Sequence, residues 1–78
     1  METTIQRIFG ECVRSFRTET GLSQEKFALT IGMDRSYYAS VESGKRNISI
    51  ANIEKIAEGL HIPMSELFAA VDDRRKYR

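Results

Sequence analysis

Apolar residues recur every three or four positions along most of the chain. In the first such stretch they are Ile5, Ile8, Phe9, Cys12, Val13 and Phe16. This spacing places them on one side of a helix of about four turns, with polar residues on the other side. The pattern stops near Thr20 and Gly21, where a glycine suits the left-handed turn that ends many helices.

Two short helices are predicted next, over residues 24–31 and about 35–43. Each follows a residue whose side-chain oxygen can accept a hydrogen bond from the free N–H groups of the first turn, Ser23 in one case and Asp34 in the other. A glycine follows each helix and indicates its end. Because only residues 32–34 separate them, the two helices are expected to cross steeply, as in a helix-turn-helix unit.

Two further helices are predicted after a loop at residues 45–48. Ser49 caps the fourth helix, whose apolar positions are Ile50, Ile53, Ile56, Ala57 and Leu60. Pro63 stands in the first turn of a fifth, whose apolar face carries Met64, Leu67, Phe68 and Val71. No stretch alternates long enough to indicate a strand. The chain is therefore predicted to be a single all-α domain of five helices over residues 1–78, with residues 72–78 as a flexible basic tail.

The composition excludes several classes of protein. The chain has 78 residues, 41% hydrophobic and 29% charged, which fits one small globular domain. Its single cysteine, Cys12, excludes an internal disulfide, and with one histidine, His61, no four-ligand zinc site can be assembled. No apolar run approaches the roughly 18–20 residues of a membrane span, and the N-terminus lacks the pattern of a signal peptide. We therefore expect a cytoplasmic protein with no membrane partner.

The residues with catalytic or cofactor-binding potential have simpler interpretations. Cys12 lies on the apolar face of the first helix, where a buried structural thiol is more usual than a nucleophile. Gly44 and Lys45 suggest a phosphate-binding loop, but Ala39 stands where its first glycine belongs and Arg46 replaces its serine or threonine. We therefore expect no enzyme activity, no cofactor and no metal.

The charges are unevenly distributed, although the formal net charge is only +1. Residues 48–70 carry a net charge of −2, residues 71–78 carry +2, and Lys45 and Arg46 form a local basic pair. Such segregation can orient a protein on a polyanion even when its total charge is small.

The outer face of the third predicted helix favours contact with nucleic acid. At about 100° per residue, the inner side collects Tyr38, Val41 and Glu42, and Tyr37 lies on the flank. The outer side carries Arg35, Ser36, Ala39, Ser40 and Ser43. Small residues with a donor near the helix N-terminus suit close approach to base edges in the major groove of DNA. An ordinary solvated face is the alternative, but three serines lower helix propensity without a structural gain.

Several motifs around this helix occur in the order and spacing of one family. They are Gly21–Ala28, Asp34–Tyr38, Val41–Asn47 and Ile53–Leu60. With them the chain resembles the XRE/Cro-cI-type helix-turn-helix regulators from about Ile8 to Phe68, and among these the small controller proteins of restriction–modification systems. The resemblance implies a lambda-repressor-like DNA-binding domain.

The resemblance also implies roles for individual residues. The base-reading residues would be Arg35, Ser36, Ala39 and Ser40. The phosphate-binding residues would be Gln24, Tyr37, Lys45, Arg46 and Asn47. An ordinary first-turn residue is the alternative for Gln24, and surface packing is the alternative for Tyr37.

The same layout pairs Arg17 with Glu42. Glu42 falls on the inward side of the third helix, where an unpaired carboxylate would be costly, and Arg17 at the end of the first helix is the nearest candidate partner. We expect a buried ion pair that fixes the orientation of the third helix more than it adds stability. The alternative is a pair of exposed charges worth less than about 1 kcal/mol.

These features together predict a DNA-binding transcriptional regulator that acts as a homodimer on a pseudo-palindromic operator in double-stranded DNA. Its two-fold interface is expected on the apolar stripe of the fifth helix: Met64, Leu67, Phe68 and Val71. RNA polymerase is a further candidate partner. Two other classes stay open, a protein-interaction module of the same fold, such as an antitoxin or coactivator, and a structural or oligomerisation domain.

Overall fold

The structure is a computed structural model that describes residues 4–76. Helices joined by short loops are the regular secondary structure of these residues. The helices are α1 (Thr4–Thr20), α2 (Gln24–Thr30), α3 (Arg35–Glu42), α4 (Ile50–Leu60) and α5 (Met64–Lys76). None of these helices combines the length and the apolar character needed to cross a bilayer. The predicted all-α, five-helix fold is confirmed.

The predicted capping residues begin α2, α3 and α4. Each side chain accepts a hydrogen bond from the backbone N–H three positions on: Ser23 from Lys26 at 3.1 Å, Asp34 from Tyr37 at 3.0 Å and Ser49 from Asn52 at 3.2 Å. Such a bond satisfies one N–H group that the first turn leaves free and contributes about 1 kcal/mol. Pro63, predicted within the first turn of the last helix, instead lies just before α5, where its carbonyl accepts the N–H of Glu66.

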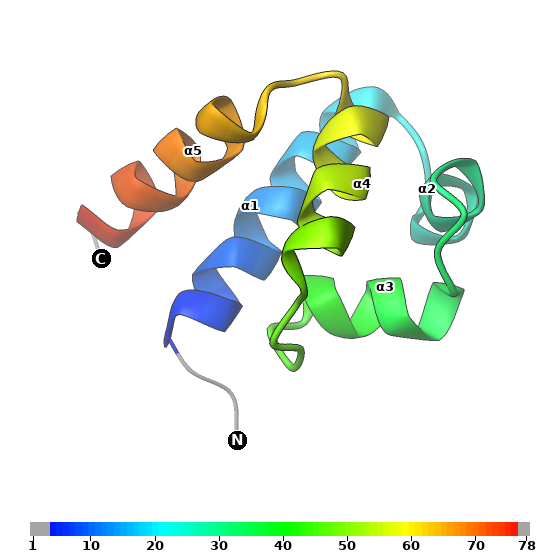
Figure 1. Cartoon of the computed structure of the whole chain (residues 1–78), viewed down its shortest axis with the longest axis horizontal. Helices are drawn as coiled ribbons and strands as arrows, with labels where there is room; N and C mark the ends of the chain where they lie inside the picture. Colours follow the sequence, from blue (N-terminus) through cyan, green and yellow to red (C-terminus); the bar gives the residue numbers. More distant parts are fainter. Residues whose placement is uncertain (1–3, 77–78) are drawn as a thin grey trace.

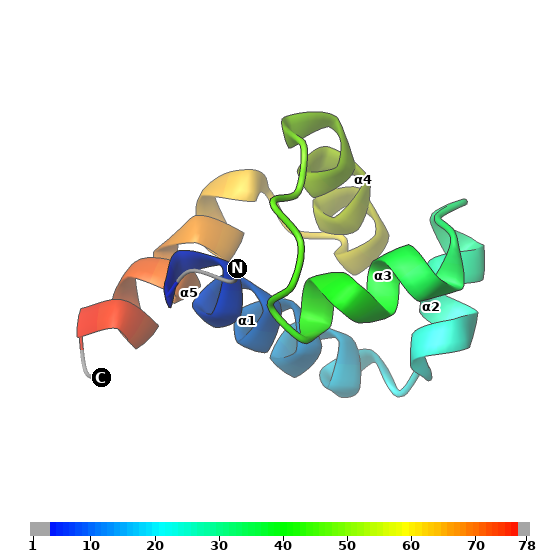
Figure 2. The same ribbon diagram turned by 90° about the horizontal axis from the view of Figure 1, so that it is seen from below.

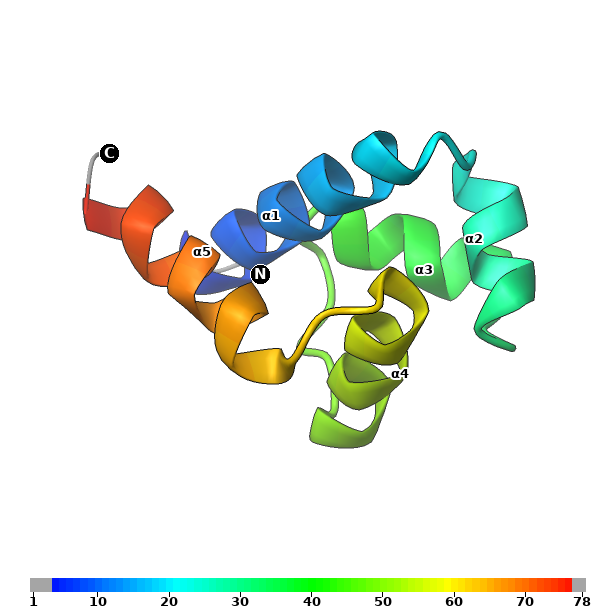
Figure 3. The same ribbon diagram turned by 90° about the horizontal axis from the view of Figure 1, so that it is seen from above.

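Helix α1 is the centre of the arrangement. Helices α3, α4 and α5 each pack against it, and α2 packs against α3. Figures 1 and 3 show α5 and α2 at opposite ends of the molecule, with α3 beside α2. The largest fully buried side chains of the core are Tyr38, Phe27, Ile8, Ile56, Leu67, Val13, Val71 and Cys12.

Helices α2 and α3 form the predicted helix-turn-helix unit. Residues 31–34 connect them, and Gly32 has the positive φ of +66° that the turn requires. The rings of Phe27 and Tyr38 pack between the two helices with their centroids 5.2 Å apart. Seen from below, α3 lies along the surface with no other helix in front of it (Figure 2). Its inner side faces the core, and its outer side faces solvent.

Helices α1 and α3 approach each other closely at Gly10. A Cβ atom at this position would lie 2.4 Å from the carbonyl oxygen of Val41 and 2.6 Å from that of Glu42, closer than real Cβ atoms come. The last turn of α3 therefore rests on the backbone of α1. A glycine inside a helix costs up to about 1 kcal/mol relative to alanine, and this close contact offsets the cost.

Residues 72–76, predicted as part of a flexible tail, instead form the end of α5. The helix runs along α1, where the ring centroids of Phe9 and Phe68 lie 5.9 Å apart. Near its end, Nη1 of Arg74 lies 3.6 Å from Oε1 of Glu11. The pair of Arg74 and Glu11 is a contact with α1 beyond Val71, the last apolar position of α5. Residues 77 and 78, the end of the predicted tail, lie outside the described residues, as do residues 1–3.

Candidate nucleic-acid interface

The outer side of α3 is open to solvent. Arg35 and Ser36 are exposed at its N-terminal end, and Ala39 and Ser40 are half-buried further along. The residues predicted for the inner side are buried: Tyr38, Val41 and Glu42. The structure thus brings the four predicted base-reading residues onto one face.

Ser40 is more constrained than its position on this face suggests. Its Oγ donates a hydrogen bond to the carbonyl oxygen of Tyr37 at 2.6 Å and accepts one from Nε of Arg46 at 2.9 Å. A hydroxyl group has only one proton to donate. The proton of Ser40 is therefore already used within α3, and its hydroxyl offers a DNA base little more than an acceptor.

The loop after α3 leaves the helix through a turn at Gly44. Its φ is +82°, and a Cβ there would lie 2.7 Å from Cα of Arg7. The backbone N–H groups of Gly44 and Lys45 donate to the carbonyls of Val41 and Ser40, which satisfies the last turn of α3. This turn directs residues 45–47 to the C-terminal end of the open face.

Arg46 is held against the flank of α3. Its Cζ lies 4.9 Å from the centroid of the Tyr37 ring, which is a cation–π arrangement, and its Nε bonds to Ser40. Lys45 and Asn47, on either side of it, are exposed. Four of the five predicted phosphate-binding residues therefore lie together beside α3.

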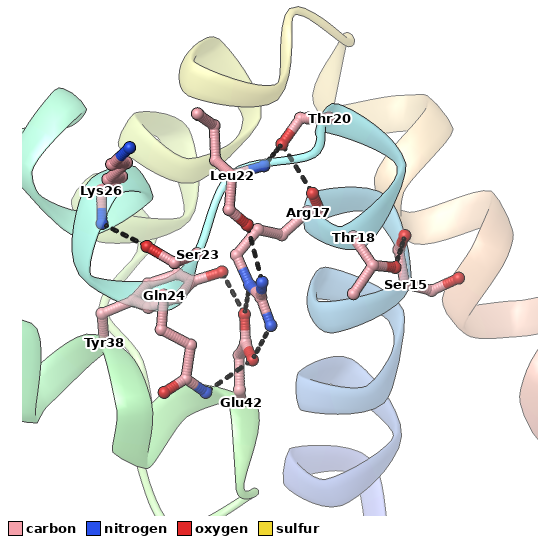
Figure 4. Close-up of polar contacts among 10 residues, drawn as sticks. All are labelled: Ser15, Arg17, Thr18, Thr20, Leu22, Ser23, Gln24, Lys26, Tyr38 and Glu42. Carbon is pink, nitrogen blue, oxygen red and sulfur yellow. Dashed lines mark hydrogen bonds and ion pairs between the residues drawn. The ribbon is translucent and has the colours of Figure 1, made fainter.

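A buried polar network behind the face ties α3 to α1 and α2 (Figure 4). Nε of Arg17 donates to Oε2 of Glu42 at 2.7 Å, Nη2 donates to Oε1 at 3.1 Å, and Nη1 donates to the carbonyl of Leu22 at 2.8 Å. Oε1 of Glu42 also accepts from Nε2 of Gln24 at 2.8 Å, and Oε2 accepts from the Tyr38 hydroxyl. The side chains of Arg17 and Glu42 are 10% and 2% exposed. The ion pair that the resemblance implied is thus present and buried.

Burial and hydrogen bonding act in opposite directions on the Glu42 carboxyl. Desolvation by burial raises its pKa, but the hydrogen bonds from Arg17, Tyr38 and Gln24 lower it, and the net result is a pKa below the usual 4.5. The hydrogen bonds to Glu42 raise the pKa of Arg17. Desolvation raises the pKa of the Tyr38 phenol, and the hydrogen bond to Glu42 raises it further. At neutral pH the network therefore contains a carboxylate, a guanidinium and a neutral phenol.

Three hydrogen-bonding residues around α3 were not predicted in these roles from the sequence: Tyr38, Gln24 and Asn52. Tyr38 and Glu42 lie four positions apart on one helix face, so their contact was readable from spacing. The bond from Gln24 to Glu42 depends on how α2 crosses α3, and a sequence carries no local signal for it. The same holds for Asn52 of α4, whose Nδ2 donates to the hydroxyl of Tyr37 at 3.1 Å.

Two of the four residues predicted for the dimer interface do not fit that role. Leu67 and Val71 are 0% and 2% exposed, because α5 turns this side of the helix toward α1 and the core. Phe68 and Met64 are 40% and 36% exposed, and Ile5 at the start of α1 is 44% exposed. A hollow beside Phe68 and Ile5 is lined mainly by apolar residues of α1, α4 and the loop before α4. The exposed apolar surface therefore keeps only half of the predicted stripe, Met64 and Phe68, and adds Ile5 from α1.

The helix-turn-helix unit and its surroundings match known proteins in sequence. A family model described as helix-turn-helix matches residues 13–67. The chain is also 52% identical over 65 residues to the control protein C.MunI of a Mycoplasma species, and this alignment covers 82% of the chain and 88% of that protein. The chain belongs to the helix-turn-helix family, in the group of the control proteins.

Solved structures of helix-turn-helix control proteins share this fold. The restriction–modification controller protein C.AhdI from Aeromonas hydrophila is 48% identical, with a TM-score of 0.77 over 80% of this chain and 94% of that one. The controller protein C.Esp1396I was solved as a tetramer in complex with its natural 35 base-pair operator. It is 26% identical, with a TM-score of 0.85 over 92% of this chain and 95% of that one. The names of these relatives describe them as restriction–modification controller proteins.

Proposed function

We propose that this helix-turn-helix protein is a transcriptional regulator of the restriction–modification controller type, which binds operator DNA as a homodimer. The observation that carries the proposal is the open outer face of α3, with Arg35 exposed at its N-terminal end and Arg46 held against its flank by Tyr37 and Ser40. The major groove of B-DNA is wide enough to admit such a helix. The complex of C.Esp1396I with its operator supports this use of the fold. Neither catalysis nor a cofactor is part of the role, and its site of action is the cytoplasm.

Base recognition falls mainly to the N-terminal half of α3. Arg35 is the first residue of the helix, and its planar guanidinium matches the O6 and N7 acceptors of a guanine. Ser36 follows as a second exposed donor. Ala39 offers a methyl group suited to a thymine methyl, while Ser40 adds an acceptor. Sequence preference should therefore concentrate in the base pairs nearest Arg35.

Phosphate contacts on the α2 side come from Gln24. Its amide nitrogen donates one hydrogen to Glu42 and carries a second that can bind a phosphate oxygen. The Gln24 side chain then links the bound phosphate to Glu42 and the buried network around it. On the opposite side, the phosphate-binding group consists of Tyr37, Lys45, Arg46 and Asn47.

A second copy of the chain covers the apolar patch formed by Ile5, Met64 and Phe68. These side chains are between 36% and 44% exposed, and Ile5 and Phe68 line the hollow described above. A two-fold dimer places the same patch of both subunits in contact, so that each buries the other's apolar surface. The tetrameric assembly of C.Esp1396I on its operator supports self-association in this fold.

The test is a binding-site selection from random duplexes, followed by titration of the selected duplex at several salt concentrations. We expect a consensus with two half-sites about 10 base pairs apart, or a multiple of that, and an affinity that falls steeply with salt. Lys45→Ala should make the salt slope shallower by about one unit per bound subunit. Lys55→Ala, which removes the same charge from the acidic stretch at residues 48–70, is the matched control and should leave it unchanged. If no duplex is selected or bound at any salt concentration, the protein-interaction alternative is favoured.

A further inference from the structure

Asn52 connects α4 to the DNA-facing flank of α3. It lies in the first turn of α4, where its backbone N–H is satisfied by the Ser49 cap. Its side chain is half-buried, and its Nδ2 donates to Oη of Tyr37 at 3.1 Å, across 15 positions of sequence. The aromatic ring that carries this hydroxyl is the one on which Arg46 stacks.

The direction of this hydrogen bond determines what the Tyr37 hydroxyl can do. A phenol oxygen has one proton to donate and lone pairs to accept with. Because the oxygen accepts from Asn52, the proton of Tyr37 points away from that amide. A phosphate oxygen is only an acceptor, so a contact with DNA requires an outward-pointing proton.

We propose that Asn52 is a positioning residue for DNA binding, which fixes the Tyr37 ring and keeps its hydroxyl as a donor toward a phosphate. This inference rests on the proposed function, because it assigns a cause to the phosphate contact of Tyr37. Asn52 acts through Tyr37 and not on DNA itself. The same bond also steadies the ring beneath Arg46, so that two phosphate-binding side chains depend on one amide.

The test is a double-mutant cycle in affinity for the duplex obtained by selection, with Asn52→Leu and Tyr37→Phe as the two changes. Tyr37→Phe should weaken binding by about tenfold per half-site, which is the effect of one hydrogen bond to a charged oxygen. Asn52→Leu, which is close to isosteric but has no donor, should weaken it by about three- to tenfold. The double variant should bind as Tyr37→Phe does, because the hydroxyl that Asn52 orients is already absent.

A second variant tests the direction of the hydrogen bond. In Asn52→Asp the carboxylate can only accept, so the Tyr37 hydroxyl must turn inward to donate to it. Its loss of affinity should be larger when Tyr37 is present than in the Tyr37→Phe background, where only the added negative charge remains. Thermal unfolding followed by circular dichroism should be nearly unchanged in each variant, since the two side chains and the hydrogen bond between them are only part-buried.

The outcomes separate this inference from the proposed function. If no duplex is bound at all, the proposed function fails. If the duplex is bound but the fold-losses of affinity from Asn52→Leu and Tyr37→Phe multiply in the double variant, Asn52 contacts DNA or acts through α4. The inference is then wrong. It is equally wrong if Asn52→Leu weakens binding while Tyr37→Phe has no effect.

Discussion

Replacing Arg17 by methionine should destabilise the protein by about 3–5 kcal/mol. The guanidinium donates two hydrogen bonds to Glu42 and one to the carbonyl of Leu22, and methionine can make none of them. The Glu42 side chain is only 2% exposed, so its charge would be left in the interior without its principal partner. A chain of this size has a total stability of only about 4–12 kcal/mol, so the loss is a large share of it.

Replacing Glu42 by leucine in the same chain should recover part of this loss. The double variant no longer contains a stranded charge, but the Tyr38 hydroxyl loses its acceptor inside the core. An unsatisfied buried hydroxyl costs about 1–3 kcal/mol. Adding Tyr38→Phe should remove that cost, so the triple variant is expected within about 1–2 kcal/mol of the wild-type protein. Gln24 is half-buried and can turn its amide to water.

The pH dependence provides an independent check with a definite sign. In the wild-type protein the pKa of Glu42 is lowered below 4.5, so its contribution to stability is present above pH 4.5 and is lost as the pH falls through the folded-state pKa. In Arg17→Met the burial that raises this pKa is opposed by fewer hydrogen bonds, so the folded state gains affinity for a proton. The difference in unfolding free energy between the two proteins should therefore narrow as the pH is lowered from 7 toward 4.

Urea unfolding followed by circular dichroism at 222 nm, at one fixed protein concentration, measures these free energies. The cycle of Arg17→Met and Glu42→Leu should give a coupling energy of at least about 3 kcal/mol. If the losses of unfolding free energy in the two single variants sum to within about 0.5 kcal/mol of the loss in the double variant, the buried network is refuted. Independent exposed charges behave in that way. Affinity of the folded double variant for the selected duplex then shows whether the pair also positions α3.

Other substitutions test separately the outer face of α3, the loop after it, the proposed dimer interface and the contact between α1 and α3. Arg35→Ala should cost about 1–3 kcal/mol in binding and relax the preference at one base pair, and an unchanged consensus in a repeated selection would contradict that assignment. Arg46→Ala should weaken all sequences alike and reduce the salt slope by about one unit per subunit, whereas a changed consensus would make it a base-reading residue. Phe68→Glu should give a monomer in light scattering with weak operator binding, and a wild-type protein that is already monomeric at micromolar concentration would count against the interface. Gly10→Ala should lower the urea midpoint by forcing α3 away from α1, and an unchanged midpoint would show that the contact can relax.

Local signals in the sequence were sufficient for the helices and for the open face of α3. Capping residues such as Asp34 and the apolar spacing act within a few positions, so they can be read without knowledge of the fold. The face of α5 that meets α1 was not predictable in this way. Its stripe contains both core residues such as Leu67 and surface residues such as Phe68, and only the packing angle of two helices distant in sequence separates them. The contacts of Gln24 and Asn52 could not be predicted for the same reason, because each joins two different helices.

Helix α3 depends on its surroundings for both its stability and its direction. With eight residues, α3 is far shorter than the roughly 12–15 residues at which an isolated helix becomes marginally stable. It is held by the backbone contact at Gly10, by Glu42 on its inner side and by Tyr37 on its outer flank. A substitution in this framework moves the whole face, so it should lower affinity for every sequence while the preferred base pairs stay the same. A substitution of a side chain proposed to read bases, such as Arg35, should change the preference itself. Consensus and affinity must therefore be measured together, because affinity alone does not distinguish a displaced helix from a lost base contact.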